Sequence, residues 1–360
     1  MRSRLARVGS GIAIAGTAVV FAVVPLTGQS AAPAPQARAA GTPANWTPPR
    51  TPWGDPDLQG NYTNTYEQGT PLERPNEFAG RRLEDVKGEE LARMRREIEK
   101  RTVGNFQGPI HAPDHWWQDN LYLERGSQAW LIVDPPDGKV PPMTPQAQRR
   151  IAAAAEARKK SGRGPADSYT DRSLYDRCIT RGMPNSGMPS IYGNSSEIVQ
   201  APGYVVIRYE MIHEARVIPL DGRPRISGNL QMDMGDSRGR WEGDTLVVET
   251  TNFKERSVYR NANPATLKLV ERFRRINPNQ VQWTVTVEDP ETWTRPWTFT
   301  LPLTVDDVPL PSYECHEGNY GLKNILSAAR AEERDALQSG RKVAPGEAVS
   351  GDGSAPQEGR

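Results

Sequence analysis

Two of the four histidines in this chain have a glutamate close by in the sequence. His213 follows Glu210 near the end of an apolar, β-branched stretch, and His316 is followed directly by Glu317. A histidine beside a carboxylate suits proton transfer, because its pKa lies near neutral pH and the carboxylate fixes its tautomer. We therefore expect one of these pairs to act as a general acid or base. The alternative is a structural corner held by ion pairs.

Two arginines flank the first pair in the sequence, Arg208 and Arg216. A guanidinium at this position would stabilise an oxyanion that develops during an elimination, an isomerisation or a hydrolysis. The sequence has no GxSxG elbow, Walker loop or Rossmann fingerprint. The expected enzyme therefore acts on a small molecule and needs no organic cofactor.

The other two histidines, His111 and His115, have the i, i+4 spacing of a metal-binding pair on a helix. Prolines interrupt this stretch, and the glutamate of an HExxH motif is absent. No metal site is expected here, and the favoured interpretation is a surface loop that packs Trp116 and Trp117. An exposed pair of indoles would also stack on sugar rings.

Two further tryptophans, Trp293 and Trp297, are candidates for the same ligand-binding role. Tyr209, on the strand that leads to His213, is a further candidate. The alternative for the tryptophans is packing in the core or at its rim, since tryptophan is highly buried on average.

The chain has two cysteines, Cys178 and Cys315. In an oxidising compartment they can form a disulfide that closes a loop of about 137 residues, and the alternative is two separate buried thiols. A bridge would bring Asp176 and Arg177 toward His316 and build a site from distant parts of the chain. A Cys315–His316 nucleophile is disfavoured, because adjacent residues on a strand point to opposite faces.

The N-terminus reads as a secretory signal peptide over residues 1–39. Arg2, Arg4 and Arg7 precede an apolar run over 11–24, and small residues follow it. The run is about 14 residues long, whereas a bilayer span needs about 20. We expect a periplasmic or secreted protein with no stable membrane span in the mature chain.

Charge is balanced, with 45 Lys and Arg against 44 Asp and Glu. Such a chain has no global field to attract nucleic acid, so the expected partner is a small-molecule ligand. Hydrophobic residues make up 36 % and charged residues 25 %, which is typical of a water-soluble globular chain. The oligomeric state is left open.

Composition divides the chain further. Residues 40–56 read as a proline-rich tether, 57–338 as a single β-rich domain, and 339–360 as a disordered tail. Apolar spacing predicts helical insertions at about 82–102 and 144–162, and a third helix at about 321–337.

Alternating apolar and polar residues predict antiparallel strands in the second half of the domain. A Glu242-Gly243-Asp244 turn predicts one hairpin, and Val281, Trp283, Val285 and Val287 share one face of another. Strands are expected over 204–211, 215–220, 240–249 with its turn, 267–276, 281–287 and 298–305.

Several blocks of the sequence resemble a large family of exported bacterial proteins of unassigned function. The resemblance covers most of residues 50–335 and implies export, but no reaction. The blocks are Pro52–Tyr62, Leu131–Gly138, Glu210–Arg223, Met234–Leu246, Trp293–Trp297 and Glu314–Tyr320.

Gly60-Asn61-Tyr62 is similar to the Gly-x-Trp that opens lipocalin-like barrels, with tyrosine in place of tryptophan. This similarity implies an aromatic plug at one end of a barrel. The expected fold class is therefore mainly β (a β-rich α+β chain), an antiparallel meander or lipocalin-like barrel with a few peripheral helices. Its expected function is an exported small-molecule enzyme. The alternatives are a binding protein for a hydrophobic or glycosidic ligand and a structural envelope protein.

Overall fold

The computed structural model describes residues 46–105, 126–190 and 192–340. Its strands are β1 Gly60–Thr63, β2 Ile132–Asp134, β3 Ser195–Ala201, β4 Tyr204–Tyr209, β5 Ala215–Pro219, β6 Asp236–Glu242, β7 Thr245–Thr251, β8 Lys268–Asn277, β9 Gln280–Glu288 and β10 Trp297–Val305. Its α-helices are α1 Gly88–Asn105, α2 Pro145–Lys160 and α3 Gly321–Ser339. The predicted signal peptide, and the predicted tail from residue 341 onward, lie outside the described residues.

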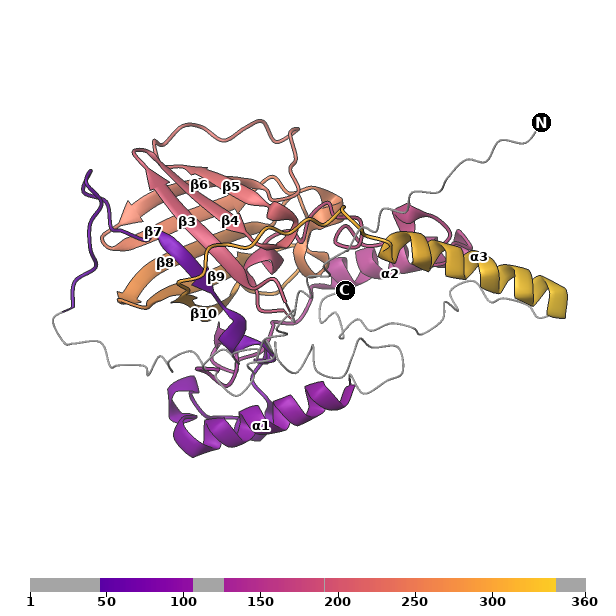
Figure 1. Cartoon of the computed structure of the whole chain (residues 1–360), viewed down its shortest axis with the longest axis horizontal. Coiled ribbons are helices and arrows are strands. Elements are labelled where there is room, and N and C mark those ends of the chain that lie inside the picture. The colour runs from indigo at the N-terminus through magenta and orange to yellow at the C-terminus, as the bar shows by residue number, and fades with distance from the viewer. Residues whose placement is uncertain (1–45, 106–125, 191, 341–360) are drawn as a thin grey trace, which may run out of the picture. The chain divides into compact units, whose positions relative to one another are not determined.

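The ten strands form one antiparallel sheet in the order β5-β4-β3-β1-β10-β9-β8-β7-β6, and β2 pairs with β10. The sheet curls into a nearly closed barrel, which brings its two end strands, β5 and β6, close together (Figure 1). Gly239 of β6 makes this approach possible. A Cβ at Gly239 would lie 2.6 Å from Cδ2 of Leu220 and 2.9 Å from Cγ2 of Ile218. The predicted fold class is confirmed.

The predicted hairpins are present. Gly243, with φ +60°, turns β6 into β7, and this left-handed conformation favours glycine. In β9 the four residues predicted to share a face are all buried, while the residues between them are half-buried. The strict alternation identifies which side of each strand faces the core.

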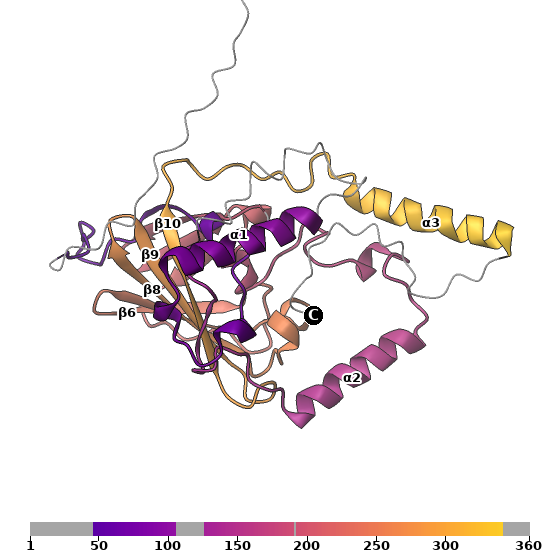
Figure 2. The same cartoon turned by 90° about the horizontal axis from the view of Figure 1, so that it is seen from below.

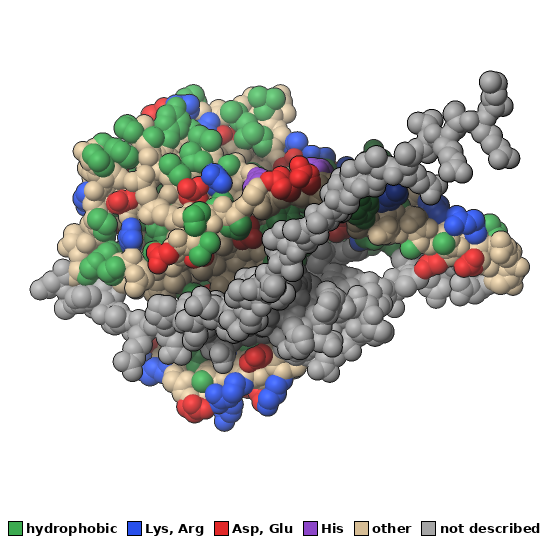
Figure 3. All heavy atoms as spheres, in the orientation of Figure 1, with side chains coloured by type: hydrophobic (Ala, Val, Ile, Leu, Met, Phe, Trp, Pro, Cys, Tyr) green, Lys and Arg blue, Asp and Glu red, His purple; other side chains and the backbone are tan. Residues whose placement is uncertain are grey.

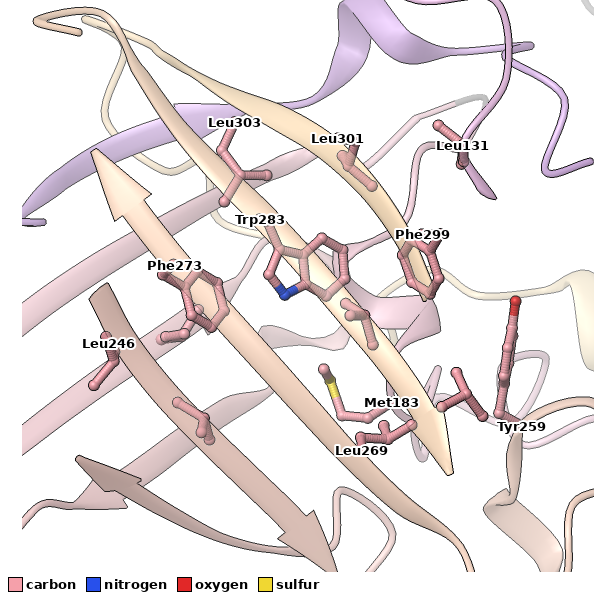
Figure 4. Close-up of a cluster of buried hydrophobic side chains, with 14 of the residues drawn as sticks. Leu131, Met183, Leu246, Tyr259, Leu269, Phe273, Trp283, Phe299, Leu301 and Leu303 are labelled. Carbon is pink, nitrogen blue, oxygen red and sulfur yellow. The ribbon is translucent and has the colours of Figure 1, made fainter. Parts of the chain in front are cut away.

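Aromatic side chains fill the inside of the barrel. Trp283 lies between Phe273 and Phe299, with ring centroids 6.2 and 5.7 Å away (Figure 4). Trp297 packs on Phe299, and Trp293 packs on Trp297 at 5.8 Å. The interior is therefore packed core, in which these indoles are covered by protein.

The outer face of the same sheet carries two exposed valines, Val199 and Val217, and a half-buried one between them, Val206. Val199, Val206 and Val217 are cross-strand neighbours on β3, β4 and β5. Hydrophobic side chains appear on this part of the surface (Figure 3). Arg208, also on this outer face, pairs with Glu197 at 3.0 Å.

The three α-helices lie outside the strands (Figure 2). The predicted second helix is present as α2, where the Thr144 side chain caps the helix by accepting from the Ala147 N–H. The first helix begins at Gly88 rather than 82, because Leu83–Asp85 form a 3-10 turn and Val86 is extended. The third helix, α3, runs two residues beyond its predicted end.

Part of the predicted tether is folded. The Arg50 guanidinium pairs with Asp244 at 2.7 Å, and the Thr51 N–H donates to the Asp55 carbonyl. Arg50 therefore ties this stretch to the β6–β7 turn and the Thr51–Asp55 bond closes a turn within it, which corrects the tether prediction for residues 50–56. Within the described residues, no helix is long and apolar enough to cross a membrane.

Candidate functional site

The predicted disulfide is confirmed, and it ties two distant segments to one end of the barrel. Cys178 and Cys315 are bridged across 137 residues, with their Cα atoms 5.7 Å apart. The bridge holds the segment around Tyr313 near the corner between β4 and β5. It therefore assembles side chains from both ends of the domain.

The corner itself contains His213. Residues Met211–His213 form a 3-10 turn in which Ile212 and His213 have φ values of 61° and 52°. The main-chain N–H of Tyr313 donates to Nε2 of His213 at 2.6 Å. His213 therefore positions the disulfide-linked segment.

The expected pairing of His213 with Glu210 is not formed. Oε2 of Glu210 instead accepts from the main-chain N–H of Ser195 at 3.1 Å, and no hydrogen bond or ion pair between these two described residues joins their side chains. The reason is the left-handed turn, which directs His213 toward Tyr313.

The second expected pair, His316 and Glu317, lies on exposed backbone. The described contacts there are main-chain bonds, such as that from the Glu317 N–H to the Glu314 carbonyl. His316 and Glu317 are therefore not brought together with the other candidates.

The two predicted arginines lie on opposite faces of the sheet. Arg208 points outward, as described above, whereas Arg216 is buried inside the barrel. The Arg216 guanidinium binds both oxygens of Glu271, at 2.6 and 3.0 Å, and the Trp283 N–H donates to Glu271 at 3.1 Å. Burial would lower the pKa of Arg216, but the charge of Glu271 raises it above its usual range.

Tyr209 lies beside this buried ion pair, with the Arg216 guanidinium 5.9 Å from its ring centroid. Burial raises the pKa of Tyr209 above its usual range. Tyr209 and Trp283 also line a cavity of about 10 Å³, the space for one water molecule. The cavity is also lined by Ser186.

The ligand-stacking interpretation of Trp293 and Trp297 is corrected. Trp293 is 2 % exposed and Trp297 is fully buried, so neither presents a face to a sugar. The other stacking candidates, Trp116 and Trp117, and the disfavoured metal pair, His111 and His115, lie outside the described residues. Elsewhere in the described ranges, no group of three His, Cys, Asp or Glu side chains could hold a metal ion.

The structure reveals a second cluster at the disulfide-linked end. We call Tyr175, Arg181, Tyr192, Tyr313 and Glu214 the barrel-end site. The hydroxyls of Tyr175 and Tyr192 are 3.0 Å apart, and the Arg181 guanidinium lies 5.7 Å from the centroid of the Tyr175 ring. Burial raises the pKa of Tyr175 and of Tyr313, so both phenols stay protonated at neutral pH.

Glu214 forms the floor of this site. Its Oε2 accepts from the main-chain N–H of Arg181 at 3.0 Å and from the Ser186 hydroxyl at 3.1 Å. Burial raises the pKa of Glu214 above its usual range, although hydrogen bonds from Thr180, Arg181 and Ser186 oppose the shift. Because Ser186 also lines the small cavity, the site borders the barrel interior.

Arg181 lacks a carboxylate partner. Among the residues that the structure describes, none forms a hydrogen bond or ion pair with its guanidinium, and its Nη1 atom is enclosed. Burial lowers the pKa of Arg181, while the neighbouring tyrosines and Glu214 oppose that shift. A guanidinium in such surroundings attracts an anion.

The backbone at Tyr192 depends on the next residue, Gly193. Its φ is +74°, and a Cβ there would lie 1.9 Å from Sδ of Met211. Glycine therefore lets this segment cross the corner closely enough to place Tyr192 beside Tyr175.

Sequence reasoning missed this site, although three of its residues lie close to predicted ones. Tyr175 and Tyr313 flank the two cysteines, and Glu214 follows His213. The expected disulfide was the available signal, because it predicted that these segments would meet. No motif or periodicity in the sequence pointed to Arg181, because it stands in an irregular stretch between Thr180 and Gly182.

Comparison with known proteins finds no match: no family model, curated protein or solved structure is significantly similar to this chain.

Proposed function

We propose that the protein is an exported enzyme that transfers protons on a small molecule bound at the barrel-end site, with Glu214 as its acid or base. The observation that carries this proposal is the position of Glu214, a half-buried carboxyl that accepts from the Ser186 hydroxyl and the Arg181 main-chain N–H. A carboxyl with a raised pKa retains its proton above the pH at which an exposed glutamate loses it. Such a group can both donate and accept a proton during turnover.

The neighbouring groups supply the rest of the chemistry. The phenols of Tyr175 and Tyr313 stay protonated and can donate hydrogen bonds to an oxyanion, and Arg181 supplies positive charge. These roles suit an elimination, an isomerisation or a hydrolysis without an organic cofactor. His213 acts as a positioning residue, because its Nε2 holds the Tyr313 amide.

Two features support the compartment and the barrel architecture that this proposal assumes. The signal-peptide pattern in the sequence and the Cys178–Cys315 bridge suit a periplasmic or secreted enzyme, since disulfides persist in oxidising compartments. The ten-stranded barrel with Tyr62 buried in its first strand suits a lipocalin-like architecture. Burial raises the pKa of Tyr62 to about 12, and its hydroxyl donates to the Leu58 carbonyl.

The test compares the full chain with Glu214→Gln during incubation with pools of small metabolites, followed by mass spectrometry. Glu197→Gln is the matched control, because Glu197 lies on the outer face in an exposed ion pair. We expect one compound to be consumed by the wild type and the control, and about 100-fold more slowly by Glu214→Gln. Equal consumption by Glu214→Gln would contradict the proposal. Binding without consumption by any variant would favour the binding-protein alternative.

A further inference from the structure

We propose that Arg181 binds the carboxylate of a small organic monoacid whose apolar body packs against the tyrosines of the barrel-end site. This inference rests on the proposed function in that it names the class of ligand for the same site. It stands on geometry: the guanidinium has an enclosed Nη1 atom and lies over the Tyr175 ring, whose hydroxyl contacts that of Tyr192, and the Arg181 main-chain N–H donates to the Glu214 carboxyl.

Among the described residues three arginines are buried; two of them pair with a carboxylate, and the third, Arg74, donates to the main-chain carbonyls of Arg81 and Pro136. Arg216 is neutralised by both oxygens of Glu271, and Arg95 is paired with Glu67 at 3.2 Å and with the Thr70 hydroxyl. Arg181 has no such partner among the described side chains. An enclosed cation without a counterion is costly, and an anion from solution would remove that cost.

The surrounding charges favour a single negative charge on the ligand. Glu214 accepts from the Arg181 main-chain N–H and its charge acts on the guanidinium, and Asp233 is close enough to add to the negative potential at Glu214. A dianion such as phosphate would be repelled by an ionised Glu214. The single positive charge of Arg181 would not compensate for both of its negative charges. A carboxylate instead matches the planar fork of one arginine with one charge.

The phenols suit the rest of such a ligand. The Tyr175 hydroxyl donates to that of Tyr192, and it can donate to an anion instead, because a phenol both donates and accepts. The Tyr175 ring offers apolar surface beside the cation. Arg181 is half-buried as a residue, which leaves a route from solvent to the guanidinium.

The test measures binding to the full chain by isothermal titration calorimetry, without requiring turnover. The probes are benzoate, cinnamate and decanoate, with benzamide as the uncharged partner of benzoate and inorganic phosphate as the dianion. The variant is Arg181→Met. Its matched control is Arg177→Met, because Arg177 also lies over a tyrosine ring, Tyr169, at 5.3 Å.

We expect at least one of the three carboxylates to bind the wild type and Arg177→Met, and to bind Arg181→Met about 10- to 100-fold more weakly. Benzamide and phosphate should not bind. Without ligand, Arg181→Met should melt at a higher temperature than the wild type, because it removes an enclosed, unpaired charge. A cooperative melting transition of Arg181→Met also shows that the variant folds.

Three results would overturn the inference: no binding by any of the three carboxylates, equal binding to Arg181→Met, or equal binding of phosphate. Glu214→Gln separates this inference from the proposed function. If the carboxylates bind Glu214→Gln and the wild type but neither converts them, the ligand class stands and the enzymatic proposal fails.

Discussion

Tyr313 donates its main-chain N–H to Nε2 of His213 at 2.6 Å, and two residues later the chain is bridged to Cys178. One hydrogen bond and one covalent bond therefore hold the C-terminal segment on the corner between β4 and β5. Tyr313 reaches the barrel-end site through both contacts, and each can be removed separately.

The disulfide should contribute a large part of the stability of this domain. Replacing both cysteines by serine should lower the free energy of unfolding by about 2–5 kcal/mol, because the bridge closes a long loop. Denaturant titration of the full chain measures this change. The wild type with a reductant should unfold like the double variant, and the double variant should not respond to the reductant. A wild-type curve that reductant leaves unchanged would count against the bridge.

Replacing His213 by alanine should lower stability slightly, whereas replacing His316 by alanine should not. His213→Ala loses the acceptor for the Tyr313 amide and should cost at most about 1 kcal/mol of stability. His316→Ala, in an exposed segment, should leave stability unchanged. Denaturant titration measures both, and catalytic assays show whether either histidine is also needed for turnover. The positioning role of His213 fails if its replacement abolishes turnover while Tyr313 keeps its environment, as followed by tyrosine NMR signals.

The buried pair of Arg216 and Glu271 should behave as one unit. Replacing Glu271 alone by Leu should cost about 3–5 kcal/mol, because Arg216 is then left charged in the barrel interior. Replacing both, as Arg216→Met with Glu271→Leu, should cost less than the two single changes together. A double-mutant cycle from denaturant titrations measures this coupling. Additive costs would show that the two side chains act independently.

Gly239 should be the residue that lets the barrel close. Gly239→Val should destabilise the fold by about 1–3 kcal/mol, because its side chain would meet Leu220 and Ile218 across the β5–β6 approach. Gly228→Val is the matched control, since nothing lies within 4 Å of a Cβ there. Thermal unfolding compares the two, and equal midpoints would contradict the close approach of these strands.

Glu214 should make stability depend on pH in a direction opposite to most carboxylates. Its folded pKa is raised by burial, so the folded state binds more protons than the unfolded state between the unperturbed value and the raised one. The Glu214 contribution is therefore fully present below its unfolded pKa and is lost as pH rises through its folded pKa. The groups that face it are Arg181, Asp233, Thr180 and Ser186.

The measurement is the difference in free energy of unfolding between the wild type and Glu214→Gln across this pH range. We expect the wild type to lose stability relative to the variant as pH rises, and to show a constant difference above the folded pKa. A difference that stays flat from acid to neutral pH would show that the Glu214 carboxyl is not perturbed by the fold.

Local patterns predicted much of the barrel. The alternation in β9 and the Gly243 turn define their hairpins without help from the rest of the chain. Strand β3, Ser195–Ala201, was not predicted, because its two serines and its Glu and Gln weaken the apolar signal. Its place between β1 and β4 comes from pairing across the chain.

The candidate site was harder to predict than the fold. Tyr175 and Tyr313 lie on irregular segments that the disulfide joins, and the spacing of residues in such segments does not show which side chains meet. The left-handed conformation of His213 was equally hidden, since non-glycine residues rarely adopt it, and it decides that His213 contacts Tyr313 rather than Glu210.

The most direct measurement is the conversion rate of a carboxylate that binds the full chain, compared between the wild type and Glu214→Gln at saturating ligand. Our account predicts a loss of about 100-fold in kcat, with Kd within about threefold of the wild-type value. An unchanged kcat in Glu214→Gln would contradict the claim that the barrel-end site transfers protons.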